Sequence, residues 1–267
     1  MTIDSQLHAA HSIYREFPVS TRLAARFLCF WTQNIVGLKG DYRHQVLPDG
    51  CADIVFINDE EPVVVGPWTE PFDVSLIKGT RIFGIRMHPG CAADVLGLPA
   101  SELLNQSVPL REVCRQLSVG FDQIREPKVG PAKKAVLAEA ALTALEPRVT
   151  LDRAVMLGIQ WIAKHPAGRI GQLSRLVGVG ERQLRRRFSI AIGYGPKMFQ
   201  SVIRFQRLLK TAAETKGAIR LADLAVNVGY ADQAHMTREV QRFADGKPTA
   251  VLTHAECTLQ MSDLFKT

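Results

Sequence analysis

Three arginines in the C-terminal third of the chain could contact the bases of double-stranded DNA. Arg182, Arg185 and Arg186 stand at positions i, i+3 and i+4, so a helix would place them on one stripe. Leu184 and Phe188 would then face a core on the opposite side. A guanidinium can donate two hydrogen bonds to O6 and N7 of guanine in the major groove. The spacing therefore predicts a helix that reads bases.

A second segment, DQAHMTREVQRF, has the same layout with less charge. Its apolar residues Met236, Val240 and Phe243 are predicted to face a core. The outward side chains suit adenine, a thymine methyl group or a phosphate, and they are Gln233, Ala234, Thr237 and Arg238. We expect the first helix to supply most of the base readout and the second to tolerate more sequence variation.

The two segments are equivalent parts of an internal repeat with offsets of 51 to 52 residues, which indicates one supersecondary unit used twice. In each copy a short helix (170–177; 221–228) ends at a glycine, and a second helix follows from Glu181 or Asp232. This arrangement predicts two helix-turn-helix units, at about 169–191 and 220–243, with a longer turn in the second. The matched residues are Leu173, Gly178, Leu184, Phe188 and Pro196, and then Leu224, Gly229, Met236, Val240 and Pro248.

A helix from about residue 196 to residue 215 is predicted to join the two units. Pro196 suits its first position. Such a helix would separate the two base-reading helices by roughly one DNA turn, about 34 Å. Its inner stripe is expected to be Phe199, Val202, Ile203, Gln206 and Leu209. Its expected phosphate contacts are Arg204, Arg207 and Lys210.

The charge of the chain is concentrated in this region. Residues 151–252 contain 17 Lys and Arg against 7 Asp and Glu, a balance of +10, which leaves −3 for the rest of a chain of net charge +7. A basic block beside a mildly acidic one indicates a polyanion partner. No apolar run approaches the about 18 residues of a membrane span, and the N-terminus has no signal-peptide layout. The expected location is cytoplasmic, without a membrane partner.

The N-terminal part is predicted to be a small antiparallel sheet or barrel, so the fold class is α+β. Short β-branched runs at 54–57, 63–65, 74–77 and 82–87 are separated by turn formers. A helical start and a strand or buried segment at 26–31 precede them, and helices at about 91–97, 108–117 and 132–145 follow. We interpret 118–131 and 146–150 as linkers. The expected division is a sensor or dimerisation domain at 1–150 and a DNA-binding domain at 151–267.

The sequence leaves the role of the N-terminal part open. A pocket in its sheet could hold a small effector, but every lining candidate is also explained as core or surface, so the effector site is unassigned. These candidates are Trp31, Trp68, Phe72, Phe83 and Arg86. Thiol sensing by Cys51 or Cys91 would require a lowered thiol pKa.

No metal, cofactor or enzymatic activity is expected. The five cysteines (Cys29, Cys51, Cys91, Cys114 and Cys257) include no CxxC pair, and His44, Cys51, His88 and Cys91 are not spaced as zinc ligands. The chain contains no GxSxG, HExxH, P-loop or GxGxxG motif. One alternative is a cysteine that accepts alkyl groups, which a search for methylated cysteine would test. Another is a structural DNA binder without sequence preference, whose affinity would follow salt alone.

Two segments resemble the AraC/XylS family of transcription regulators: RLVGVGERQLRRRFSIAIGYGPKMFQSVIRFQRLL and LADLAVNVGYADQAHMTREVQRFADGKP. The second follows the family signature in its Gly-aromatic pair, Asp-Gln-x-His and closing Gly-x-Pro. The second segment departs from the family pattern at Met236 and at the Ala244-Asp245 pair. The first segment departs from it at Gly180. The segments around LPDGCADIVF and RMHPGCAADVLG are similar to a β-rich leader of some actinobacterial-type members.

The resemblance implies a transcription regulator with double-stranded DNA as its partner. It implies base contacts by Arg182, Arg185 and Arg186, and by Gln233, Ala234 and Arg238. A small effector and a homodimer are further partners that it leaves open, and RNA polymerase is expected if the protein is an activator.

Overall fold

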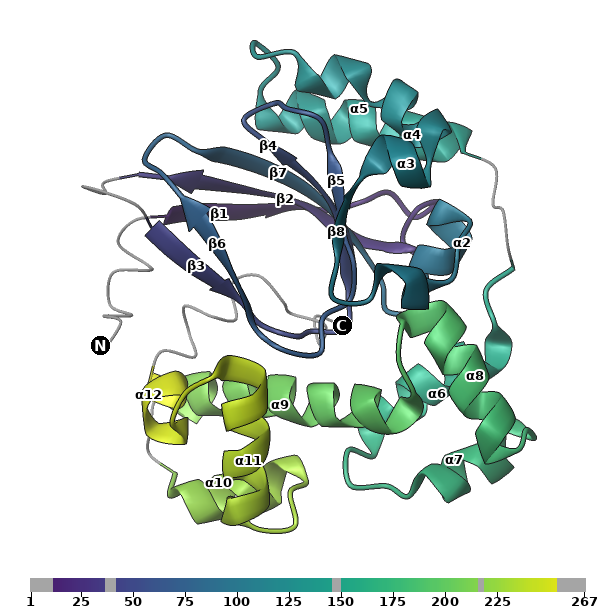
Figure 1. Ribbon diagram of the computed structural model, residues 1–267, viewed down its shortest axis with the longest axis vertical. Coiled ribbons are helices and arrows are strands. Elements are labelled where there is room, and N and C mark those ends of the chain that lie inside the picture. Colours follow the sequence, from purple (N-terminus) through teal and green to yellow (C-terminus); the bar gives the residue numbers. More distant parts are fainter. Residues whose placement is uncertain (1–11, 37–41, 146–149, 216–218, 254–267) are drawn as a thin grey trace.

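The computed structural model describes residues 12–36, 42–145, 150–215 and 219–253 (Figure 1). Strands fill the first part of the chain, together with the short helices that cover them, and helices alone follow from residue 153. The predicted α+β class, with an antiparallel sheet followed by two helix-turn-helix units, is confirmed.

The larger sheet has six strands in the order β1-β2-β7-β4-β5-β8, and every neighbouring pair is antiparallel. Strands β3 (Tyr42–Val46) and β6 (Phe72–Leu76) form a separate two-stranded ribbon. The six strands are β1 (Ser12–Phe17), β2 (Phe27–Ile35), β4 (Ala52–Ile57), β5 (Val63–Val65), β7 (Arg81–Met87) and β8 (Ser107–Pro109).

One face of the six-stranded sheet carries the main core of the N-terminal part. Alternate residues of the central strands, such as Phe30, Ile54 and Ile85, are fully buried there. Helices α3, α4 and α5 lie over the sheet in Figure 1, with α2 beside them. Their bounds are α2 (Ala92–Leu96), α3 (Leu110–Val113), α4 (Arg115–Gly120) and α5 (Pro131–Ala144), with 3₁₀ turns η1 (Ala100–Leu103) and η2 (Asp122–Arg125).

The structure corrects three expectations for the N-terminal part. Residues 12–17 form the edge strand β1 and not part of a helical start. The segment 118–131 is not a linker, because it contains the end of α4 and the turn η2, and Phe121 and Ile124 are fully buried in the core. The expected helix at 108–117 is divided among β8, α3 and α4. Residues 1–11 and 146–149 and Cys257 lie outside the described ranges.

The helical part is organised around the long helix α9 (Pro196–Thr215). Helices α6, α7 and α8 lie at one end of α9, and α10, α11 and α12 lie at the other (Figure 1). The repeat is visible in this arrangement, because Pro196 begins α9 and Pro248 begins α12. The other bounds are α6 (Arg153–Lys164), α7 (Ile170–Val177), α8 (Glu181–Ile192), α10 (Leu221–Val228), α11 (Gln233–Ala244) and α12 (Pro248–Thr253).

A buried ion pair in the sheet fixes the loop that contacts α9. Arg86 on β7 binds Asp53 through Nε at 3.1 Å and through Nη2 at 3.2 Å, and its Nη2 lies 3.4 Å from Asp49 Oδ2. Trp31 Nε1 also donates to Asp53 Oδ1, at 2.8 Å. Four charged or polar partners thus satisfy one another out of solvent, which is the condition for a buried ion pair to persist.

The loop that carries Asp49 joins the two parts of the molecule. The carbonyl oxygen of Pro48 accepts a hydrogen bond of 2.6 Å from Gln206 Nε2 on α9. A Cβ built on Gly50 would stand 3.0 Å from the Phe199 ring, so the backbone packs directly on α9. At the end of α8, Gly193 lies as closely against Pro67. The sheet therefore positions both the joining helix and the C-terminal end of α8.

Candidate nucleic-acid interface

The first helix-turn-helix unit consists of α7 and α8. Gly178 ends α7 with φ of 69°, a left-handed conformation that glycine adopts at little cost. Leu184 and Phe188 on α8 are fully buried. Phe188 lies so close to Gly158 of α6 that a Cβ there would come within 2.7 Å of its ring. The predicted inner face of α8 is confirmed, and α6 holds it in place.

The outer face of α8 carries the three predicted arginines. Arg182, Arg185 and Arg186 are all exposed, and none of them forms an ion pair with another residue in the described ranges. Their neighbour Arg187 differs, because it is half-buried and its Nη1 lies 3.3 Å from Asp152 Oδ1, at the start of α6. Three guanidiniums are thus free to bind a partner, while the fourth fastens α8 to the domain.

The second unit consists of α10 and α11 and has the longer turn that the repeat predicts. Gly229 ends α10 with φ of 99°. Three residues then separate it from α11, against two between Gly178 and α8. Asp232 caps α11, because its carboxylate accepts a hydrogen bond of 2.6 Å from the backbone N–H of His235. Met236, Val240 and Phe243 are fully buried, as predicted.

The outer face of α11 is exposed and mildly charged. Gln233, Ala234, Thr237 and Arg238 are all open to solvent. The Thr237 hydroxyl donates to the carbonyl oxygen of Gln233 at 2.9 Å, so its proton is used within the helix. The predicted direction of these side chains is correct, and their contacts with DNA remain a prediction.

The predicted inner stripe of α9 is also confirmed, because all five of its residues are buried: Phe199, Val202, Ile203, Gln206 and Leu209. Arg207 and Lys210 are half-buried on the same helix.

Arg204 does not have the predicted position. Its side chain is 8% exposed, and its Nη2 lies 2.9 Å from Glu239 Oε1 of α11. Its Nη1 donates to the carbonyl oxygen of Pro166 at 3.0 Å, and its guanidinium stands over the Tyr230 ring at 5.4 Å. Because these contacts use the guanidinium inside the domain, we remove Arg204 from the expected phosphate contacts. It joins α9 to the second unit.

The loop between α6 and α7 brings the two units into contact. Gln200 on α9 donates to the carbonyl oxygen of Gly168 in this loop at 2.7 Å. On the other side of the loop, a Cβ on Gly229 would lie 3.3 Å from Ala167 N. No motif in the sequence of this loop predicts these contacts. They fix one unit against the other, so the two recognition helices have a set separation.

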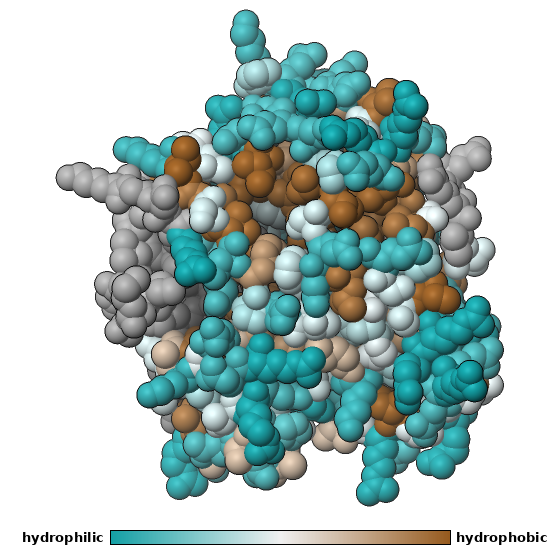
Figure 2. Space-filling model, viewed as in Figure 1, coloured by the Kyte–Doolittle hydropathy of each residue, from teal (hydrophilic) through white to brown (hydrophobic). Residues whose placement is uncertain are grey.

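The surface of the helical part is largely polar. Figure 2 shows hydrophilic side chains over most of this region, while apolar side chains gather over the strands. No helix in the described residues is long and apolar enough to cross a membrane. Within the same residues, no group of three or more His, Cys, Asp and Glu is arranged to hold a metal ion.

Most of the effector candidates in the N-terminal part have structural roles. Trp31 and Arg86 belong to the buried ion-pair cluster, and Phe83 is a core residue. Trp68 and Phe72 stack on each other, with ring centroids 4.0 Å apart. Of two cavities that lie in the N-terminal part, one is lined by Phe83, and neither is lined by Trp31, Trp68, Phe72 or Arg86.

The cysteines do not have the environment of a redox sensor. Cys29, Cys51, Cys91 and Cys114 are buried, and none of them forms a disulfide within the described residues. Burial raises the pKa of Cys51 well above its usual range and that of Cys91 to about 12. A reactive cysteine needs the opposite shift, towards the thiolate.

Comparison with known proteins agrees with this geometry. Residues 173–254 match the family of a helix-turn-helix domain, and residues 15–109 match a domain of unknown function, DUF6597. None of the curated proteins matches the chain.

Similar solved structures are those of ToxT from Vibrio cholerae. A 1.65 Å structure of ToxT is 10% identical, with 84% of this chain and 98% of that chain covered and a TM-score of 0.43. ToxT bound to (E)-4-(8-methylnaphthalen-1-yl)but-3-enoic acid is 10% identical, with 91% and 98% covered and a TM-score of 0.43. Unsaturated fatty acid-bound ToxT is 9% identical, with 91% and 95% covered and a TM-score of 0.38.

The two helix-turn-helix units and their exposed recognition faces define a DNA-binding protein. The chain contains an AraC-type helix-turn-helix domain at residues 173–254, which follows a DUF6597 domain at residues 15–109. The resemblance recognised from the sequence is thereby confirmed.

Proposed function

We propose that the protein regulates transcription by binding one DNA sequence preferentially, with α8 and α11 in successive major grooves. The observation that carries the proposal is the pair of exposed helix faces that α9 and the loop at 165–168 hold in a fixed relation. On α8 the face consists of Arg182, Arg185 and Arg186, which suit guanine. On α11 it is Gln233, Ala234, Thr237 and Arg238. Arg207 and Lys210 add phosphate contacts.

The test of sequence preference is a selection from random duplexes, followed by affinity measurement at several salt concentrations. A regulator should prefer its selected site over unrelated DNA by about 10³-fold or more. A structural DNA binder would show equal affinities that fall together as salt increases. Equal affinities for selected and unrelated duplexes would contradict the proposed function.

Replacement of Lys210 by alanine is expected to weaken the binding of all duplexes alike. Lys210 lies on α9 and belongs to neither recognition helix, so we expect it to contact backbone phosphates and not bases. The slope of log affinity against log salt should become shallower by about 1. Titrations on the selected site and on an unrelated duplex measure both effects. A changed sequence preference in this variant would show that α9 faces the bases.

We further propose a division near residue 150, with a sensor or dimerisation domain before it and the DNA-binding domain after it. A small effector would bind in the N-terminal domain, and its binding would reach the DNA through the contacts of Pro48 and Gly50 with α9. A homodimer and contact with RNA polymerase during activation complete the proposal. The site of action is the cytoplasm, where the DNA lies.

A further inference from the structure

We propose that the cavity beside the N-terminus of α5 binds a small metabolite that carries an oxyanion group, either a phosphate or a carboxylate. This inference rests on the proposed effector function and names the site and the class of ligand. The cavity has a volume of about 230 Å³ and lies between α5 and the ends of β2 and β7. Ligand pockets usually measure about 300–1,000 Å³, so this one suits a small metabolite.

Cations outnumber anions in the lining of this cavity. Arg81, Lys128 and Lys134 face a single carboxylate, that of Asp59, which gives 3 − 1 = +2. Asp59 binds Arg81 Nη2 at 2.8 Å through one oxygen and Lys134 Nζ through the other. Lys128 is exposed and has no ion-pair partner in the described ranges. The excess positive charge in a concave site attracts an anion.

A buried residue with a hydroxyl group, Thr32, also lines this cavity. Thr32 is only 4% exposed, and its side chain forms no hydrogen bond with another residue in the described part of the chain. Asn34, two residues along β2 and on the same face of the sheet, also lines the cavity. Buried polar groups in proteins almost always have a hydrogen-bond partner. A ligand oxygen in the cavity would provide one for Thr32.

The N-terminus of α5 lies at this cavity, because Gly130 and Pro131 belong to its lining. Gly130 precedes α5 and offers no side chain to cap it, so the backbone N–H groups of Ala132 and Lys133 have no partner within the helix. The N-terminus of a helix carries a partial positive charge and is suited to anions. Next to Gly130 the space is open, because a Cβ built there would meet no atom within 4 Å.

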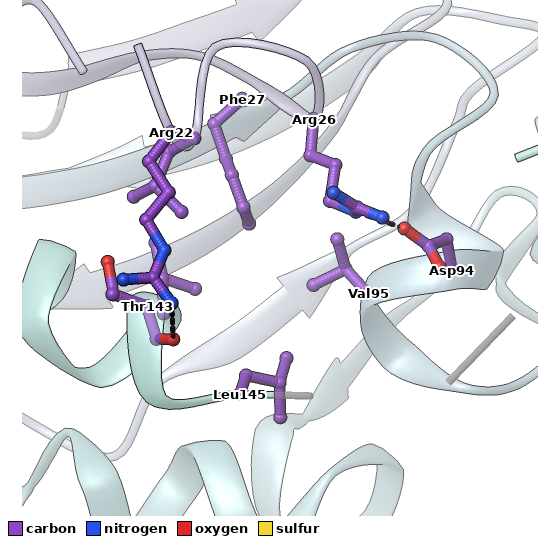
Figure 3. A pocket seen from close by; sticks show the side chains of 9 residues that line it. Arg22, Arg26, Phe27, Asp94, Val95, Thr143 and Leu145 are labelled. Atoms are coloured by element: carbon purple, nitrogen blue, oxygen red, sulfur yellow. Dashed lines mark hydrogen bonds and ion pairs between the residues drawn. The ribbon is translucent and has the colours of Figure 1, made fainter. Parts of the chain in front are cut away.

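A second cavity, at the other end of α5, lacks these features (Figure 3). It has a volume of about 150 Å³, and its two arginines are directed to acceptors within the protein. Arg26 forms an ion pair with Asp94, and Arg22 Nη2 donates to the carbonyl oxygen of Thr143 at 3.4 Å. The C-terminal end of a helix is also the negative end of its dipole. This cavity therefore provides a control.

The test is isothermal titration of the full-length protein with inorganic phosphate, glycerol 3-phosphate and succinate, which separate the phosphate from the carboxylate source. Gly130→Asp is expected to weaken binding by about tenfold or more, because it places a carboxylate at the site and removes charged hydrogen bonds. The same change caps α5, so the fold should be retained. Lys128→Ala should weaken binding also. The matched controls Gly130→Ala and Arg22→Gln should bind as the unaltered protein does.

Three results would overturn the proposal: no heat of binding with any of the three anions, equal binding by Gly130→Asp and Gly130→Ala, or a loss of binding in Arg182→Ala. The third would place the anion on the DNA-binding surface. The affinity of each variant for the selected duplex is measured without anion in parallel. Failure of the anion site and failure of the proposed DNA binding are thereby distinguished.

Discussion

Simultaneous replacement of Arg182 and Arg186 by alanine is expected to abolish most of the preference for the selected DNA site. Each guanidinium that pairs with guanine contributes about 1–3 kcal/mol of discrimination. Two together should cost roughly 2–6 kcal/mol if their contributions add. Both side chains are exposed and make no ion pair within the described residues, so their loss should not affect the fold. Fluorescence anisotropy on selected and unrelated duplexes measures the effect.

Two comparisons make this prediction specific. Arg186→Ala alone should lose about 1–3 kcal/mol at the selected site, and the loss should come at one base position. Gln233→Ala with Arg238→Ala, on the second recognition helix, should lose less, since we expect α11 to tolerate more sequence variation. An equal fall on selected and unrelated duplexes in Arg182→Ala/Arg186→Ala would show that α8 contacts phosphates alone. A larger effect from α11 would reverse the assigned roles.

Replacement of Arg86 by methionine is expected to lower the free energy of unfolding by about 3–5 kcal/mol, because removal of one partner leaves buried charge without compensation. Asp53 would lose both of its bonds to the guanidinium, and Asp49 would lose the nearby cation. Denaturant titration monitored by circular dichroism measures the change. Arg81→Met is the matched control on the same strand. Arg81 is 59% exposed, and a surface ion pair contributes only about 0–1 kcal/mol.

The loss in Arg86→Met should also depend on pH. Burial already raises the pKa of Asp49 above its usual value, and Arg86 opposes that rise. Without Arg86 the pKa rises further, so the folded state retains a proton that the unfolded state releases. Stability then falls as the pH rises through the folded-state pKa. The deficit against the unaltered protein should be smaller at acid pH than at neutral pH. If the loss of unfolding free energy in Arg86→Met did not change with pH, the substitution would not leave a buried carboxylate without its cation.

The connection between Arg86 and the DNA-binding helices is short. Arg86 holds the loop of Asp49, and the neighbouring Pro48 accepts the hydrogen bond from Gln206 of α9. Tyr194 lies at the junction of α8 and α9, and its hydroxyl lies beside this loop. Burial there raises the pKa of Tyr194. A rearrangement of the sheet would therefore reach the segment that positions both recognition helices.

The helical part could be predicted closely from the sequence because it occurs twice. Each apolar position in one copy has an equivalent in the other, and Gly178 and Gly229 mark the same left-handed turn. Local signals of this kind depend on residues a few positions apart. The bounds of α7, α9 and α10 therefore agree with the predicted ranges 170–177, 196–215 and 221–228.

The errors arise where long-range contacts decide the outcome. The sequence pattern predicts an outer position for Arg204, but α9 is surrounded by other helices and Glu239 of α11 provides a buried partner. Phe121 and Ile124 lie in a segment without periodicity, and only the packed helices around them show that they belong to the core. The cavity beside α5 brings Thr32, Asp59 and Lys128 together from distant segments, and no spacing rule relates such positions.

Footprinting of the full-length protein on its selected duplex tests the central claim most directly. If α8 and α11 occupy successive major grooves, protection of the base atoms exposed in the major groove should fall in two clusters separated by roughly 10 base pairs, about one helical turn. The cluster with the stronger protection should disappear in Arg182→Ala/Arg186→Ala, while the other persists. A single protected cluster, or uniform protection along the duplex, would contradict the account of two unequal reading helices held at a fixed separation.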